Sequence, residues 1–129
     1  MAAKCRQTLA GLGAGTPREH SIPGSLELPS AAQYLIENSR SPLEAVICFG
    51  VILKGETLHF ELISHEVMRG IGRVSFATRT PIISEVLTVL DLSDAIERAQ
   101  DDEYNKGIEA AVAAAEIIAW RRALVADRR

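Results

Sequence analysis

Two apolar segments separated by a helical pattern constrain the fold of this chain more than any other feature. Residues 45–53 (AVICFGVIL) are apolar on both faces, which is typical of a central parallel strand. Pro81 opens a second apolar strand over residues 82–90. Between them, residues 61–77 carry an apolar stripe at helical spacing. Because parallel strands need a long crossover connection, this pattern predicts an α/β fold.

Further helices are expected on both sides of these strands. Residues 2–12 predict a short helix, an extended segment follows at 20–22, and Pro29-Ser30 starts another helix. A short helix is expected at 93–98, and an alanine-rich helix from Asn105 to about Val125. The expected order is α–β–α–β–α–β–α–α in one domain, with helices on both faces of a mainly parallel sheet in three layers. The inward-facing helix positions are expected to be Leu9, Leu12, Ala31, Leu35, Ile36, Leu62, Ile63, Val67, Ile71, Val74, Ile108, Val112, Ile117 or Ile118, and Leu124.

Composition and charge exclude several classes of function. A chain of 129 residues fits one domain, and its 24% charged residues argue against disorder. The net charge of −3 provides no basic face for nucleic acid, and no apolar run approaches the length of a membrane span. The amino terminus lacks the apolar core of a secretory signal, so we expect a cytoplasmic protein.

The two cysteines differ in their surroundings. Cys48 lies inside the first apolar strand and is expected to be a buried small hydrophobe. Cys5 lies on a polar helix and is expected to be an exposed thiol. Neither belongs to a CxxC pair, so the sequence predicts neither a disulfide framework nor a cysteine metal site.

A histidine follows the first apolar strand within a short polar loop. In an open α/β sheet, ligands bind at the carboxyl ends of the strands. His59 is therefore positioned for proton transfer near neutral pH, although the residues alone leave open a merely solvated side chain. His20 and His65 have no comparable placement and are expected on the surface.

Two further groups are candidates for binding phosphate. The segment Gly55-Glu56-Thr57 offers backbone N–H groups and a hydroxyl at a helix start, where the helix dipole favours anions. An ordinary capping loop is the alternative. Arg98 can form a bidentate pair with phosphate, or it can be a surface charge at the end of its helix.

Four segments in a fixed order resemble the lumazine synthase family: PGSLELP (23–29), GVILKGETLHF (50–60), IERA (96–99) and NKG (105–107). Each alone is weak, but the ordered set is specific. The resemblance covers roughly residues 24–129, whereas residues 1–23 are atypical and shortened. It implies a flavodoxin-like fold and a transferase of the penultimate step of riboflavin biosynthesis. That enzyme condenses 5-amino-6-(D-ribitylamino)uracil with 3,4-dihydroxy-2-butanone 4-phosphate and needs no metal or redox cofactor.

The resemblance also implies roles for individual residues. His59 matches the family's proton donor and acceptor. The phosphate of the four-carbon substrate is expected to be held by the Glu56 backbone, Thr57 and Arg98. The pyrimidine and its ribityl chain are expected to contact Ser25, Leu26, Glu27, Val51, Ile52, Leu53, Ser84 and Lys106.

The chain also departs from the family pattern. The family's first strand, which ends in an aromatic residue that stacks on the pyrimidine, has no counterpart, so the sheet is expected to lack an inner strand. Leu26 replaces an aromatic residue, and Ser84-Glu85 replaces a Phe-Gly pair. Each lost stacking contact weakens pyrimidine binding by about 0.5–1.5 kcal/mol.

The resemblance further implies a homopentamer, or twelve pentamers in a 60-subunit shell, with riboflavin synthase as a candidate partner. In such an assembly each site would be formed by two neighbouring copies, and we call it the shared site. One copy would contribute Ser25, Glu27 and His59, and its neighbour would contribute Arg98, Lys106 and Ser84. The alternative is a truncated, non-enzymatic relative that oligomerises and binds flavin-like or phosphorylated ligands. An unrelated phosphate-binding α/β module is a third, weaker alternative.

Overall fold

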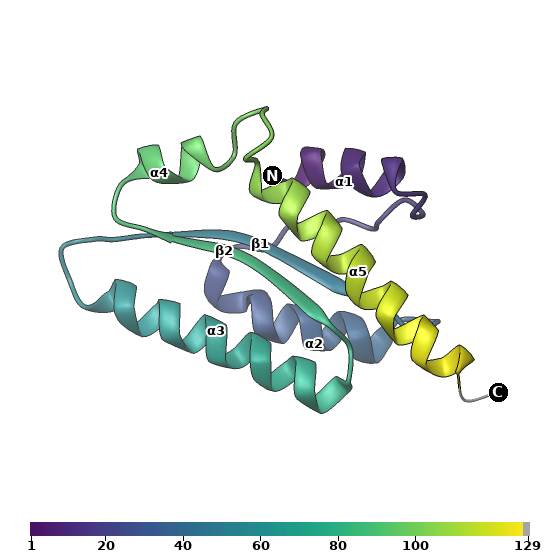
Figure 1. Cartoon of the computed structure of the whole chain (residues 1–129). Coiled ribbons are helices and arrows are strands. Elements are labelled where there is room, and N and C mark those ends of the chain that lie inside the picture. Colours follow the sequence, from purple (N-terminus) through teal and green to yellow (C-terminus); the bar gives the residue numbers. More distant parts are fainter. Residues whose placement is uncertain (128–129) are drawn as a thin grey trace.

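A computed structural model describes residues 1–127 of the chain and centres on two parallel strands (Figure 1). Strand β1 spans Val46–Leu53 and strand β2 spans Ile82–Val89. They pair in register from Val46 with Ile82 to Leu53 with Val89, so both strands begin and end together. The predicted strands at 45–53 and 82–90 are confirmed to within one residue.

The helices form a layer on each face of this sheet (Figure 1). The order is α1 (Ala2–Gly11), η1 (Ser25–Glu27), α2 (Leu28–Asn38), β1, α3 (His59–Thr78), β2, α4 (Leu92–Glu97) and α5 (Lys106–Ala126). Helices α2 and α3 cover one face, and α1, α4 and α5 lie on the other. The predicted α/β fold with three layers and a parallel sheet is confirmed. None of the helices within residues 1–127 has the length and apolarity needed to cross a membrane.

The core on the α2 and α3 face is built from branched side chains. Val67 is completely buried, and Ile71 of α3 packs with Leu28 of α2 and with Cys48 and Ile52 of β1. Burial of such side chains stabilises the fold by about 1.5–3 kcal/mol each. The predicted stripe on this helix is correct at its central positions.

The exception on this helix is Leu62, which is 69% exposed instead of buried. Phe60 and Ile63, its neighbours in the first turn, pack against the core in its place. The first turn is thus oriented by Phe60, which turns Leu62 outward.

Small side chains build the core on the opposite face. Ala110 and Ala111 of α5 are completely buried against Cys5 and Leu9 of α1. A β-carbon on Gly107 would lie 2.1 Å from the carbonyl oxygen of Met1, so α1 and α5 are in backbone contact at this point. Such an approach requires glycine and alanine.

This close approach corrects several predictions. Cys5 is 4% exposed instead of an exposed thiol, because α5 covers it. Val112 and Leu124 were expected to face inward but are 37% and 44% exposed, since the alanine face of α5 takes the buried position. Leu12, which follows the last turn of α1, is 53% exposed.

Two predicted elements differ in kind from the structure. Residues 20–22 form no strand, and β1 and β2 are the whole sheet within residues 1–127. Helix α3 begins at His59 instead of at Glu61, because Phe60 is drawn into the core as part of the first helical turn. The histidine therefore lies in the first turn of the helix and not in the loop before it.

Candidate active site

The carboxyl ends of both strands meet at one edge of the sheet. Leu53 pairs with Val89, and the backbone N–H of Lys54 donates to the carbonyl of Val89 at 2.9 Å. Beyond this point the chain leaves β1 toward α3 and leaves β2 toward α4, on opposite faces of the sheet (Figure 1). This edge is where open α/β sheets bind ligands.

The amino terminus of α3 provides groups suited to an anion. Leu58 occupies the N-cap position without a side-chain capping bond, so most of the first-turn N–H groups have no side-chain acceptor. The backbone N–H of His59 lies 3.4 Å from Thr57 Oγ1, its acceptor, which holds that hydroxyl beside the helix start. Glu56, Thr57 and His59 are all exposed. An uncapped, accessible helix start with a hydroxyl and an imidazole can bind a phosphate and move protons beside it.

The first turn of α3 also contains a carboxylate. Glu61 Oε2 is inaccessible to solvent and accepts no hydrogen bond within residues 1–127. A negative charge in the first turn is favourable to the helix dipole. The Glu61 carboxylate also competes with a bound phosphate for the same first-turn N–H groups.

Helix η1 reaches the same edge on the face of β1 that α2 and α3 also cover. Ser25 Oγ donates to the carbonyl of Val51 at 3.4 Å, and a β-carbon on Gly50 would lie 2.7 Å from that Oγ. Gly50 thus permits η1 to lie directly on the strand. Leu26 and Glu27, which follow Ser25, are exposed beside it.

The end of β1 itself presents alternating side chains. Val51 and Leu53 are 42% and 46% exposed, whereas Ile52 is 7% exposed and belongs to the core. The predicted role of these three residues lies in their backbone groups, which strand ends can offer to a planar ring.

Arg98 and Lys106 are joined on the other face of the sheet. The backbone N–H of Lys106 donates to the carbonyl of Arg98 at 2.9 Å. The Arg98 guanidinium donates through Nη1 to the carbonyl of Asp94 at 2.8 Å and is exposed. Lys106 Nζ lies 2.6 Å from Glu109 Oε2, one turn along α5.

Two residues in this region were not predicted to be site residues. Asn105 is 2% exposed: its side chain accepts from the Gly107 N–H at 2.8 Å and donates to the Gln100 carbonyl at 2.5 Å. The signal was present, because asparagine before a helix start is a preferred N-cap.

The second is Glu85, a charged residue within an apolar strand. Desolvation raises the pKa of its carboxyl; nearby Lys106 opposes this shift and Glu109 adds to it. Glu85 therefore adds an acid to the charged group formed by Lys106 and Glu109.

The predicted site residues thus fall into two groups within one chain. His59 begins α3 and Thr57 lies just before it, whereas Arg98 follows α4 and Lys106 begins α5. Helix α3 lies on the opposite face of the sheet from α4 and α5 (Figure 1). Ser84 belongs to neither group, since its Oγ contacts Met68 Sδ of α3 at 3.6 Å in the middle of β2. One chain brings together each half of the predicted site but not the two halves.

These features define an α/β protein with an accessible, uncapped helix start at the carboxyl edge of its parallel sheet. Comparison with known proteins gives the family. Residues 1–122 match the model of the 6,7-dimethyl-8-ribityllumazine synthase family. A 6,7-dimethyl-8-ribityllumazine synthase from Paracidovorax citrulli (strain AAC00-1) is 40% identical over 119 residues, which cover 91% of this chain and 73% of the relative.

The chain belongs to the 6,7-dimethyl-8-ribityllumazine synthase family, a family of transferases of riboflavin biosynthesis. The family match begins at residue 1, so it also covers residues 1–22, which precede the first of the four segments. The prediction of a lumazine synthase is confirmed.

Proposed function

We propose that this chain condenses 5-amino-6-(D-ribitylamino)uracil with 3,4-dihydroxy-2-butanone 4-phosphate at the carboxyl edge of its sheet. The products are 6,7-dimethyl-8-ribityllumazine, phosphate and water. The observation that carries the proposal is the accessible, uncapped start of α3, with Thr57 and His59 together at the end of a central strand. Membership of the family supplies the reaction.

The roles of the residues follow from their chemistry. The first-turn N–H groups of α3, the Glu56 backbone and the Thr57 hydroxyl hold the phosphate. His59 transfers protons during imine formation, phosphate elimination and ring closure, which positioning and general acid–base catalysis suffice to accelerate. Arg98 provides a bidentate partner for the phosphate.

The pyrimidine lies beside η1, at the same carboxyl edge of the sheet. Ser25, Leu26 and Glu27 contact the ring and the ribityl hydroxyls, and the backbone of residues 51–53 bonds the ring edge. Lys106 lines the pocket beside Arg98. Ser84, in the middle of β2, has the weakest claim to a contact with this substrate.

The site is shared between copies of the chain. His59 and Arg98 lie on opposite faces of the sheet in one chain (Figure 1), so their joint action on a phosphate needs a second copy. A cyclic, head-to-tail assembly brings unlike surfaces of neighbours together. A homopentamer in the cytoplasm, with a 60-subunit shell as its larger form, is the assembly that we propose.

Steady-state kinetics of the purified chain test this function through lumazine absorbance. His59→Ala lowers kcat by about 10²–10⁴-fold, the usual contribution of a general acid–base group. Arg98→Ala raises KM for the phosphorylated substrate by about tenfold or more. His65→Ala is the matched control, because His65 is exposed on the same helix and leaves both constants unchanged. Equal activity of wild type and His59→Ala refutes the catalytic assignment, and an unchanged KM in Arg98→Ala refutes the phosphate assignment.

A further inference from the structure

The outer edge of β1, which faces away from β2, carries unpaired backbone groups. The backbone N–H of Val46 donates to the carbonyl of Pro81, and that of Lys54 donates to the carbonyl of Val89, both at 2.9 Å. Because alternate residues of a strand bond the same neighbouring strand, the even-numbered residues between Val46 and Lys54 bond β2. The residues whose backbone N–H and C=O groups point to the outer edge are Ile47, Phe49, Val51 and Leu53.

Within residues 1–127 these outward groups have almost no partners. The carbonyl of Val51 accepts from Ser25 Oγ at 3.4 Å, and no backbone hydrogen bond reaches the outer edge. Residues 13–24, which connect α1 to η1, form no backbone hydrogen bond with β1. The side chains of Val51 and Leu53 are also exposed. The edge therefore offers a row of donors and acceptors to another polypeptide.

The sequence of β1 is typical of an internal strand and not of an edge strand. Natural edge strands usually carry charged residues, proline or bulges that prevent further pairing. None of the eight residues of β1 is charged or is proline, and its register with β2 is unbroken. The composition of β1 therefore gives its outer edge no protection against pairing.

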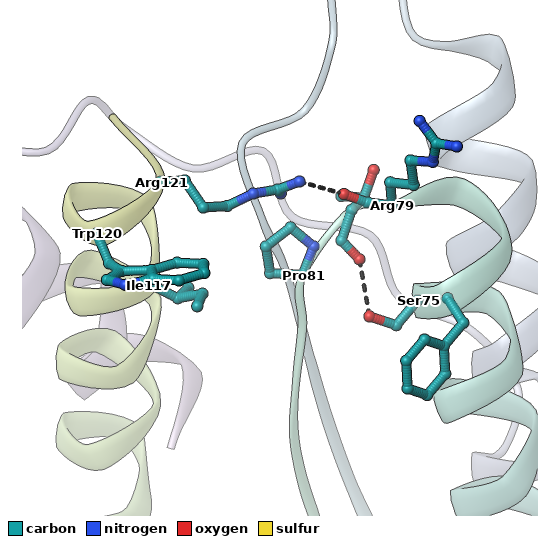
Figure 2. Close-up of a pocket in the computed structure, with 8 residues that line it drawn as sticks. Ser75, Arg79, Pro81, Ile117, Trp120 and Arg121 are labelled. Atoms are coloured by element: carbon teal, nitrogen blue, oxygen red, sulfur yellow. Dashed lines mark hydrogen bonds between the residues drawn. The ribbon is translucent and has the colours of Figure 1, made fainter. Parts of the chain in front are cut away.

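Strand β2, at the other edge of the sheet, is better protected. It contains three polar residues, Ser84, Glu85 and Thr88. Its start is bridged by Arg121 of α5, which donates to the carbonyl of Arg79 at the end of α3 at 2.6 Å (Figure 2). The outer edge of β1 is thus the edge of this sheet that a further strand joins more readily.

Apolar side chains lie next to this edge on both faces of the sheet. On the α1 face, Ile47 and Phe49 pack against the cluster that contains Leu9. On the α2 face, Leu28 Cδ1 lies 3.3 Å from the position of a β-carbon on Gly50. Helices α1 and α2 lie on opposite faces (Figure 1). A segment that pairs with the outer edge therefore lies between apolar surfaces and is itself apolar.

We propose that the outer edge of β1 binds an extended, apolar segment of a partner polypeptide as an added strand. An extended backbone presents N–H and C=O groups at the same two-residue repeat as the outer edge, which no small ligand does. The apolar surfaces on both faces select β-branched, uncharged side chains. The proposal does not depend on the proposed reaction, because binding is measured without substrate.

Amide hydrogen exchange with residue resolution tests whether the edge is free. In the purified chain, the outward amides of Phe49 and Val51 exchange at least about tenfold faster than the inward amides of Cys48 and Gly50. A valine-rich synthetic peptide with lysines at both ends slows the outward amides and leaves the inward amides unchanged. Outward amides that are already as protected as the inward ones overturn the proposal. Protection that rises with protein concentration alone also overturns it and assigns the edge to a second copy.

N-methylated peptides separate strand pairing from non-specific apolar adhesion. The peptide methylated at alternate backbone nitrogens keeps one hydrogen-bonding edge and binds β1. The same peptide methylated at every nitrogen between its lysines keeps its side chains but loses binding, because it has no N–H group left to donate. Equal binding of the two peptides overturns the proposal.

A variant of the protein tests the same contact from the other side. Val51→Pro removes one outward N–H and leaves the bonds to β2 in place, so it weakens peptide binding by about tenfold. Val51→Ala keeps that N–H and binds as wild type does. Thr88→Pro is the matched control, because the same alternation points its N–H to the outer edge of β2. Equal loss of binding in Val51→Pro and Thr88→Pro contradicts a site on β1, and the methylated peptides decide the question even if Val51→Pro does not fold.

Discussion

The backbone N–H of Lys106 donates a 2.9 Å hydrogen bond to the carbonyl of Arg98. This bond joins the end of α4 to the start of α5 and closes the loop between them. The two cationic residues of the proposed shared site are thus held as one unit on the α4 and α5 face of the sheet. Their placement depends on the residues that order this loop.

Asn105 is the residue that orders it most directly. Asn105 is 2% exposed, and its side chain bonds the Gly107 N–H and the Gln100 carbonyl. Asn105→Ala removes both hydrogen bonds and leaves these two backbone groups without their side-chain partner. We expect the free energy of unfolding to fall by about 1–3 kcal/mol in denaturant titration. KM for the phosphorylated substrate rises as well, since Arg98 loses its fixed position. Asn38→Ala at an exposed helix end is the control, and an equal loss of stability there contradicts this account.

The contact between α1 and α5 depends on Gly107. A β-carbon at this position would lie 2.1 Å from Met1 O and 2.9 Å from Cys5 N, so Gly107→Ala forces the helices apart. We expect a loss of about 1–3 kcal/mol in the free energy of unfolding. Gly72→Ala is the matched control within a helix, because a β-carbon there meets nothing within 4 Å. It stabilises the protein by up to about 1 kcal/mol, and the same sign for both variants contradicts the contact.

Glu85 makes stability depend on pH. Desolvation raises the pKa of its carboxyl in the folded state, so the folded protein binds this proton more tightly than the unfolded chain does. Its contribution therefore favours folding at acidic pH and is lost as pH rises through the raised pKa. Glu85→Gln should gain stability relative to wild type at neutral pH and lose that gain in acid. Thermal unfolding at both pH values measures this, with exposed Glu116→Gln as control; a pH-independent difference refutes it.

Both thiols should be protected from alkylation in the folded protein. Burial raises the pKa of Cys48 to about 11 and, with Glu19 adding to it, raises the pKa of Cys5. Because the thiolate is the reactive form, labelling near neutral pH is slow for both. We expect rapid labelling of both only in denaturant, followed by mass spectrometry. Fast labelling of native Cys5 would show that α5 does not cover it.

The strands and most helices of this fold were predictable, since an apolar run such as 45–53 has few stable alternatives to a buried strand. The orientation of α5 was not, because its alanines and its larger apolar residues form no single apolar face. The partner helix decides between them, and α1 selects Ala110 and Ala111 by close approach. Only tertiary packing can reveal that choice.

The same limit applies to the candidate site. The position of His59 after a strand was readable from the pattern, but its entry into α3 depends on Phe60 packing against the core. The separation of His59 from Arg98 follows from which face each crossover covers, and this is a property of the fold (Figure 1). The acid on β2, Glu85, was visible in the sequence, but its coupling to Lys106 depends on where α5 lies.

Complementation between two impaired variants is the most direct measurement of a shared site. His59→Ala and Arg98→Ala are unfolded together, refolded as an equal mixture, and assayed with the phosphorylated substrate below KM. In a head-to-tail ring, a site is intact when one neighbour keeps His59 and the other keeps Arg98, so random mixing restores about a quarter (one half times one half) of wild-type activity. A mixture no more active than the average of the two variants refolded separately would contradict a site divided between neighbouring copies.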